Sequence, residues 1–140
     1  MAHRAAAHII LGGTITASMF AGLLEVLEED GLTVEAEAVV FGRPLRLADD
    51  EVVGGEFARL ESYCVDHGLP FVRWAGACPG VFDAERVVFT GRGEPYSCTA
   101  DEDDRVLLTR DTVELLGSYA AVIAYFDGAD FSVPPLILKG

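Results

Sequence analysis

An internal repeat constrains the fold of this chain more than any other feature of its sequence. The pattern Phe20-Ala21-Gly22-Leu23 returns 37 residues later as Phe57-Ala58-Arg59-Leu60, and each copy reaches a Gly-Leu pair eleven positions after its Phe. Windows 19–34 and 56–71 are identical at five positions, where average composition gives roughly one identity by chance. We interpret the repeat as a duplication that organises the fold without specifying any chemistry.

Each copy of the repeat predicts a strand, a helix and a second strand. In the first copy, apolar residues 7–11 precede Gly12-Gly13, and a helix that Thr14 or Thr16 caps runs to Gly31. Side chains then alternate over 32–41, as in a half-buried strand. The second copy predicts a strand over 45–48, an acidic loop over 49–51, a helix over 55–67 and a strand over 69–74.

These two units, residues 9–40 and 45–76, predict an α+β fold of the ferredoxin-like type. The split βαβ repeat covers about 9–75 and forms an antiparallel sheet that two helices cover on one face. Residues 77–140 extend it with a C-terminal β-meander and a third helix. A chain of 140 residues has the size of one ordinary domain, so we expect a single domain over 1–140.

The meander is predicted as three short strands over 85–90, 96–99 and 105–109. The third helix starts at Thr109 or Asp111 and runs through about Tyr125, with two apolar stripes that predict burial on two sides. A competing interpretation breaks this helix at Gly117-Ser118 and makes 119–126 a strand. Two prolines limit residues 133–138 to an edge strand or a packed tail.

Charge excludes more functions than any motif does. The chain carries 23 Asp and Glu against 10 Lys and Arg, a net charge of −13, and we find no basic cluster that would bind a phosphate backbone directly. A negative surface favours a protein partner with a basic surface. No apolar run approaches the roughly 20 residues of a membrane span. Residues 1–8 lack the apolar core of a secretory signal, so we expect a soluble, cytoplasmic protein.

Cysteine, histidine and two acidic runs are the candidates for metal binding or catalysis. Cys64, His67, Cys78 and Cys98 do not have the paired short spacings of a zinc site. A reactive thiol needs basic neighbours or a helix N-terminus, and the surrounding charges are acidic. The acidic runs 49–51 and 101–104 also lack the spacing of a calcium loop. We therefore predict reduced thiols, no metal, no cofactor and no catalytic residue.

Three sets of residues are candidates for binding. Gly12-Gly13-Thr14 stands at a strand-to-helix junction, where free amides can hold an anion. Phe131 stands alone in a polar turn and is a candidate hydrophobic anchor. The third set is an acidic face, made of Glu28, Glu29, Asp30, Asp49, Asp50, Glu51, Asp101, Glu102, Asp103 and Asp104.

The leading hypothesis is a small acidic interaction protein that binds another macromolecule rather than an enzyme. Its sharper form is an inhibitor or nucleic-acid-mimicking decoy of the phage or mobile-element, anti-defence type, whose carboxylates occupy a basic groove on a host protein. The alternative is a ferredoxin-like ligand-binding or regulatory module that holds a metabolite or nucleotide at the glycine turn. A small Cys/His-dependent enzyme is third. A homodimer formed through sheet edges fits the first two hypotheses equally.

Overall fold

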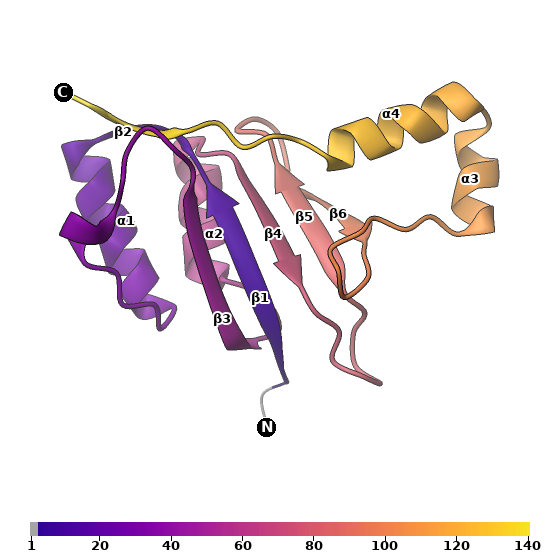
Figure 1. The fold of residues 1–140 in the computed structure, drawn as a ribbon, viewed down its shortest axis with the longest axis horizontal. Helices are drawn as coiled ribbons and strands as arrows, with labels where there is room; N and C mark the ends of the chain where they lie inside the picture. The colour runs from indigo at the N-terminus through magenta and orange to yellow at the C-terminus, as the bar shows by residue number, and fades with distance from the viewer. Residues whose placement is uncertain (1–2) are drawn as a thin grey trace.

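The structure is a computed structural model and describes residues 3–140. It is an α+β fold with one five-stranded antiparallel sheet, in the order β3-β1-β4-β5-β6, and one two-stranded parallel sheet (Figure 1). The strands of the large sheet are β1 Arg4–Leu11, β3 Leu45–Val53, β4 Phe71–Ala75, β5 Glu85–Phe89 and β6 Tyr96–Thr99. The small sheet pairs β2 Gly13–Thr16 with β7 Leu136–Lys139. The helices are α1 Ala17–Glu29, α2 Ala58–His67, α3 Arg110–Leu116 and α4 Tyr119–Ala129.

The second repeat unit forms the split βαβ arrangement. Strands β3 and β4 both run antiparallel to β1, which lies between them, and α2 connects the two. In the first unit the predicted strand over 32–41 is wrong, because this segment forms only a short 3₁₀ helix, Ala36–Ala38. Val39 is the one buried residue of the segment, so its alternation covers too little apolar surface to hold a strand. The α+β class is confirmed, whereas the complete ferredoxin-like arrangement is not.

The repeat places equivalent residues of α1 and α2 in one core. Leu23 and Leu60, which are 37 positions apart, are both fully inaccessible to solvent, and so are Leu27 and Cys64. They pack in one cluster with the inward residues of the sheet, among them Ile9, Leu11 and Phe71. The two helices therefore cover one face of the sheet, as the apolar stripes predict.

The two loops that the repeat treats as equivalent adopt different structures. The acidic loop predicted over 49–51 is wrong, because β3 continues through these residues with a register shift opposite Ala5 and Ala7 of β1. In the first copy, Gly12 packs directly against the C-terminal tail. A Cβ atom at Gly12 would lie 1.7 Å from the Pro134 carbonyl oxygen, so only glycine lets the tail cross at this point.

The second half of the chain follows the predicted strands only in part. Strands β5 and β6 extend the sheet, but residues 105–109 add no strand, and the only pairing there is the isolated bridge from Ala100 to Val106. The predicted third helix is two helices. The competing interpretation places the break correctly at Gly117-Ser118, but its strand over 119–126 is wrong because these residues form α4. The tail supplies the edge strand β7, parallel to β2.

Within residues 3–140, no helix combines the length and the apolar character that a membrane crossing requires. The longest, α1, has 13 residues, against the roughly 20 that span a bilayer.

Candidate functional site

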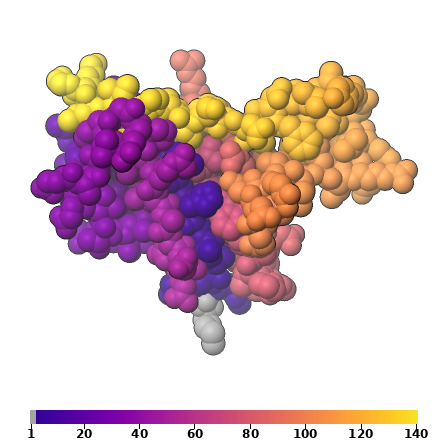
Figure 2. Space-filling view, viewed as in Figure 1, coloured from indigo at the N-terminus to yellow at the C-terminus, as the bar shows by residue number. Residues whose placement is uncertain are grey.

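Helices α3 and α4 form an arm, residues 110–129, that projects beyond the rest of the molecule (Figure 2). The sequence encodes the break between the two helices. Gly117 ends α3 in the left-handed conformation at φ 82°, which glycine adopts without strain. Ser118 then caps α4 by accepting a hydrogen bond at Oγ from the Ala121 N–H, at 3.1 Å. Thr109 caps α3 in the same way, through the Thr112 N–H at 3.2 Å.

The arm leaves its apolar side chains in solvent. Helix α3 has no buried residue, and α4 has only Ala129, at its last position. Leu115 is 87% exposed and Tyr119 is 81% exposed, the largest values among the exposed large hydrophobic residues. The predicted burial on two sides is therefore wrong: the stripes are present, but among the described residues they are at most half-buried, as at Leu116 and Phe126.

A cavity lies between the two helices of the arm. Its volume is about 480 Å³, and it is lined by Val113, Glu114, Gly117, Ser118, Tyr119 and Val122. Aromatic and aliphatic side chains around a concave surface are the usual components of a hydrophobic protein interface. Phe131, the predicted anchor, is half-buried, so Tyr119 is the better exposed aromatic.

Hydrogen bonds attach the base of the arm to the large sheet. The Tyr96 hydroxyl of β6 donates to the Gly128 carbonyl at 2.7 Å. Arg86 of β5 donates through Nε to the Ala129 carbonyl at 2.8 Å and pairs through Nη1 with Asp104, also at 2.8 Å. A hydrogen bond with the Cys98 thiol raises the pKa of Tyr125 to about 12. The arm is thus held at its C-terminal end while its tip extends into solvent.

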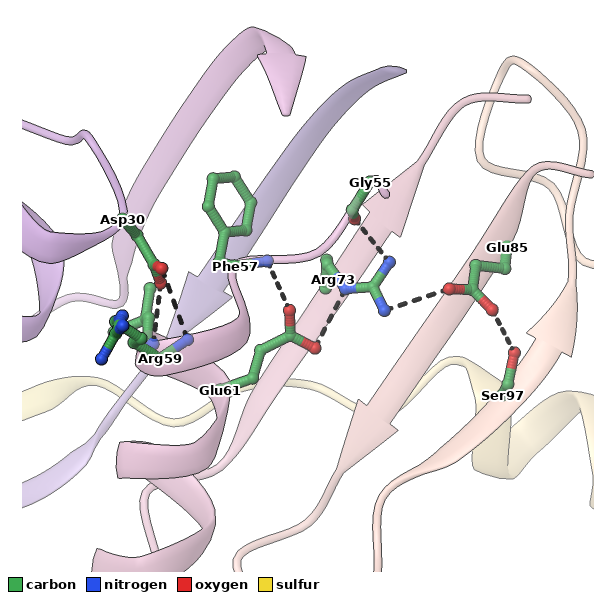
Figure 3. Close-up of polar contacts among 9 residues, drawn as sticks. Asp30, Gly55, Phe57, Arg59, Glu61, Arg73, Glu85 and Ser97 are labelled. Atoms are coloured by element: carbon green, nitrogen blue, oxygen red, sulfur yellow. Dashed lines mark hydrogen bonds and ion pairs between the residues drawn. The ribbon is translucent and has the colours of Figure 1, made fainter. Parts of the chain in front are cut away.

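The acidic residues at the end of α1 are largely engaged within the chain. Asp30 accepts hydrogen bonds from the backbone N–H groups of Leu60, at 2.8 Å, and Arg59, at 3.4 Å (Figure 3). These N–H groups belong to the first turn of α2, so Asp30 caps that helix from another part of the chain. Glu29 pairs with the Arg59 side chain at 3.2 Å, and Glu28 is exposed.

The acidic loop 101–104 also bonds to its own surroundings. Asp101 accepts from the N–H groups of Arg105 and Asp103, both at 2.9 Å, and these bonds hold the pKa of its carboxyl below the ordinary value. Glu102 accepts from the Ala77 N–H at 2.9 Å, and Asp104 accepts from Arg86. Asp103 pairs with the Arg105 side chain at 3.1 Å.

The ten predicted acidic residues come from three separate elements. The triplet 49–51 lies on β3, at one edge of the large sheet, whereas 101–104 follow β6, at the opposite edge. Asp49 accepts from the Glu51 N–H at 3.1 Å, while the side chains of Asp50 and Glu51 are exposed.

The amides of the predicted anion turn are already bonded. Gly12 donates its N–H to the Pro70 carbonyl at 3.0 Å, and Gly13 donates to the Pro135 carbonyl at 3.1 Å. Thr14 lies in β2, opposite Ile137 of β7, and α1 starts only at Ala17. The Pro70 carbonyl, which precedes β4, and the Pro135 carbonyl of the C-terminal tail therefore occupy the two amides at which an anion was expected.

Sequence reasoning missed a buried arginine cluster beneath α2 (Figure 3). Arg73 of β4 is 2% exposed, and each of its donor nitrogens has an acceptor: Nε bonds Glu61 at 3.0 Å, Nη2 bonds Glu85 at 3.0 Å, and Nη1 bonds the Gly55 carbonyl at 2.8 Å. Glu61 also accepts from the Phe57 N–H at 2.7 Å, and Glu85 accepts from Ser97 at 2.8 Å. Because every partner is satisfied, the cluster is a structural link between α2, β4 and β5.

Burial raises the pKa of the Glu61 carboxyl above its ordinary value, although the Arg73 charge opposes this shift. A cavity of about 340 Å³ borders the cluster at Glu85 and Ser97. The signal in the sequence was an arginine inside the apolar run Leu69-Pro70-Phe71-Val72-Arg73-Trp74. A buried charge in such a run needs a partner of opposite charge, but the local sequence does not identify the carboxylate that pairs with it.

The three cysteines differ in burial: Cys64 and Cys98 are buried, whereas Cys78 is half-buried. All three thiols are free, and burial raises the pKa of the Cys64 thiol to about 12, which makes it unreactive. The His67 ring packs on Tyr63, with ring centroids 4.1 Å apart. In the described part of the chain, no three His, Cys, Asp or Glu side chains are placed to share a metal ion.

No protein-family model, curated protein or solved structure matches this chain.

Proposed function

We propose that this chain is an interaction protein that binds a protein partner through the arm. The observation that carries the proposal is the exposure of Leu115 and Tyr119 on a capped helical hairpin. Large apolar side chains in solvent stabilise nothing in the monomer, whereas aromatic and aliphatic anchors contribute most of the energy of a protein interface. An amphipathic hairpin that enters an apolar groove is a recurring mode of recognition.

Charge defines the rim of the groove that the arm would enter. The arm carries three acidic residues, Asp111, Glu114 and Asp127, against the single basic Arg110, and Asp130 follows directly after its last residue. The whole chain has a net charge of −13. A groove with an apolar floor and a basic rim complements both features, and the long-range attraction accelerates association.

In its more specific form, the proposal is that binding through the arm inhibits a host protein. The nucleic-acid-mimicking version has less support, because Asp30, Asp101 and Asp104 already accept hydrogen bonds within the chain. A ligand module at the glycine turn also has less support, since the Gly12 and Gly13 amides are bonded. We therefore place recognition on the arm rather than on the acidic residues or the glycine turn.

Affinity capture tests the proposal, with the purified chain as bait in lysates of the source cell or its host. The arm variant is Leu115→Ser with Tyr119→Ser, and the matched control is Ile137→Ser with Leu138→Ser, which removes two exposed apolar residues of β7. We expect wild type and control to retain the same protein and the arm variant to lose it. Circular dichroism establishes that all three baits are folded.

The capture is repeated at roughly 0.1 M and 0.5 M salt, because the Debye length shortens from about 10 Å to a few Å over this range. A basic-rimmed partner is retained less at the higher salt. Equal capture by wild type and arm variant, or no specific protein with any bait, would refute binding through the arm.

A further inference from the structure

Strand β3 is an edge strand with an unpaired side. It is nine residues long, and β1 is the one strand that pairs with it among the described residues. No described strand occupies the neighbouring position, because residues 32–41 form only a short 3₁₀ helix, and of this segment Ala38 and Val40 line a pocket with Leu45 and Arg46 at the start of β3. An edge of this kind presents backbone N–H and C=O groups that can pair with another strand.

The side chains of β3 alternate between the two faces of the sheet. Leu45, Leu47 and Asp49 lie opposite Leu11, Ile9 and Ala7 of β1, whose side chains are buried on the helix-covered face. Arg46, Ala48 and Asp50 therefore lie on the other face, and all three are exposed. A cation and an anion thus lie on the same face, two positions on either side of Ala48.

This spacing makes the strand complementary to itself. When two copies of β3 pair antiparallel with Ala48 opposite Ala48, Arg46 of each copy lies opposite Asp50 of the other. Directly opposite residues in an antiparallel pair have Cβ atoms about 5 Å apart, close enough for both ion pairs to form. One interface therefore contains two equivalent salt bridges.

Neighbouring registers are less favourable. A register shifted by one residue, with Ala48 opposite Leu47 or Asp49, pairs side chains from opposite faces, which a continuous sheet does not permit. A shift by two residues in one direction puts Arg46 opposite Ala48, without an ion pair. The same shift in the other direction puts Asp49 opposite Asp49, and like charges directly opposite one another are destabilising.

We propose that β3 pairs with β3 of a second copy of this chain, and that a twofold axis at Ala48 joins the two sheets. Asp50 and Glu51 form a bulge opposite the single residue Ala6 of β1, so regular pairing is limited to a short segment and Asp50 stands at its end. Both copies also carry a net charge of −13. The dimer is therefore weak, with a dissociation constant of about 1–100 μM, and the arm plays no part in it.

Charge reversal separates this pairing from a general effect of net charge. Arg46→Asp makes the chain more negative by two charges, Asp50→Arg makes it less negative by two, and the double variant leaves it at −13. If only repulsion between acidic chains mattered, Asp50→Arg would strengthen the dimer. The pairing predicts instead that each single change weakens it by about tenfold or more and that the double variant restores it.

Sedimentation velocity over about 5–200 μM protein measures these differences, a range chosen to bracket the micromolar dissociation expected for a small interface. The arm variant Leu115→Ser with Tyr119→Ser serves as a control and retains the dimer. A chain that stays monomeric throughout this range would overturn the proposal. So would a dimer that all three β3 variants leave unchanged, or one that Asp50→Arg strengthens.

Cross-linking tests the register directly. Ala48→Cys in a Cys78→Ser background places two thiols on the twofold axis, where paired Cα atoms lie within disulfide reach. We expect a covalent dimer under mild oxidation. The control is Ala58→Cys in the same background, at an exposed position in the first turn of α2, and it stays monomeric. Absence of a cross-link at Ala48 in a chain that sediments as a dimer would refute this register.

Discussion

The helical layer on the sheet and the arm both contain apolar helices, but the surroundings of these helices differ. Helices α1 and α2 bury Leu23, Leu27, Leu60 and Cys64 completely against the sheet. Helices α3 and α4 also carry apolar side chains at helical spacing, yet they bury one alanine. Helical spacing of apolar residues therefore specifies a helix and its apolar face, whereas what covers that face depends on the topology of the chain.

Arg73→Met should have the largest effect on stability. The change leaves the Glu61 carboxylate buried without its cation, and loss of one member of a buried pair costs about 3–5 kcal/mol. The matched control is Arg59→Met, because Arg59 pairs with Glu29 in solvent, where ion pairs contribute about 0–1 kcal/mol. Urea unfolding measures both changes. Similar losses for the two variants would show that the buried cluster does not hold the sheet and α2 together.

Leu60→Ala and Leu115→Ala compare the two helical regions directly, since the same atoms are removed from each. Leu60 has 0% exposure, and a cavity at a buried leucine costs about 2–5 kcal/mol. Leu115 is 87% exposed, so its change stays within about 0.5 kcal/mol. The unfolding free energy from urea titration measures both. A large loss for Leu115→Ala would mean that the Leu115 side chain is packed against other residues in solution.

The sequence predicts the regions in which local pattern and packing agree. The repeat places α1, α2, β1, β3 and β4 correctly because its glycines end the helices and its apolar positions meet in one core. It fails at 32–41, where alternation is present but Ala36 and Ala38 are too small to hold a strand in place. It also fails at 49–51, where acidic side chains on an exposed edge strand resemble a loop in composition.

The candidate site was less predictable than the fold. Tyr119 and Leu115 lie in stripes that the sequence shows plainly, but exposure is a property of the assembled chain. The same limit applies to Asp30, which lies 30 positions before the Leu60 N–H that it caps, and to the contact of the tail with Gly12. Such contacts depend on which distant segments pack together, and local sequence patterns do not predict this.

Asp30→Ala tests whether an acidic residue of the predicted face stabilises the fold. Loss of a helix cap costs about 0.5–2 kcal/mol, and this cap joins the end of α1 to the start of α2. Glu28→Ala is the control, since Glu28 is exposed, and we expect its effect to stay within about 0.5 kcal/mol. Thermal and urea unfolding measure the two variants. Equal losses of stability in the two variants would show that Asp30 has no structural role, and Asp30 would again be a candidate for the acidic binding surface.

Tyr96→Phe should have the smallest effect and should act on the arm alone. It removes the hydrogen bond from the Tyr96 hydroxyl to the Gly128 carbonyl at the base of α4. A neutral hydrogen bond contributes about 1 kcal/mol, so amides of α4 should exchange about fivefold faster with solvent deuterium. Amides of α1, packed in the core on the other side of the molecule, should keep their protection. Hydrogen exchange resolved by residue measures both helices in one experiment.

Faster exchange in α1 and α4 together would mean that the two regions open as one unit, and the arm would then be part of the cooperative core. Unchanged exchange in α4 would mean that Arg86, through its bond to the Ala129 carbonyl, holds the arm without help from Tyr96.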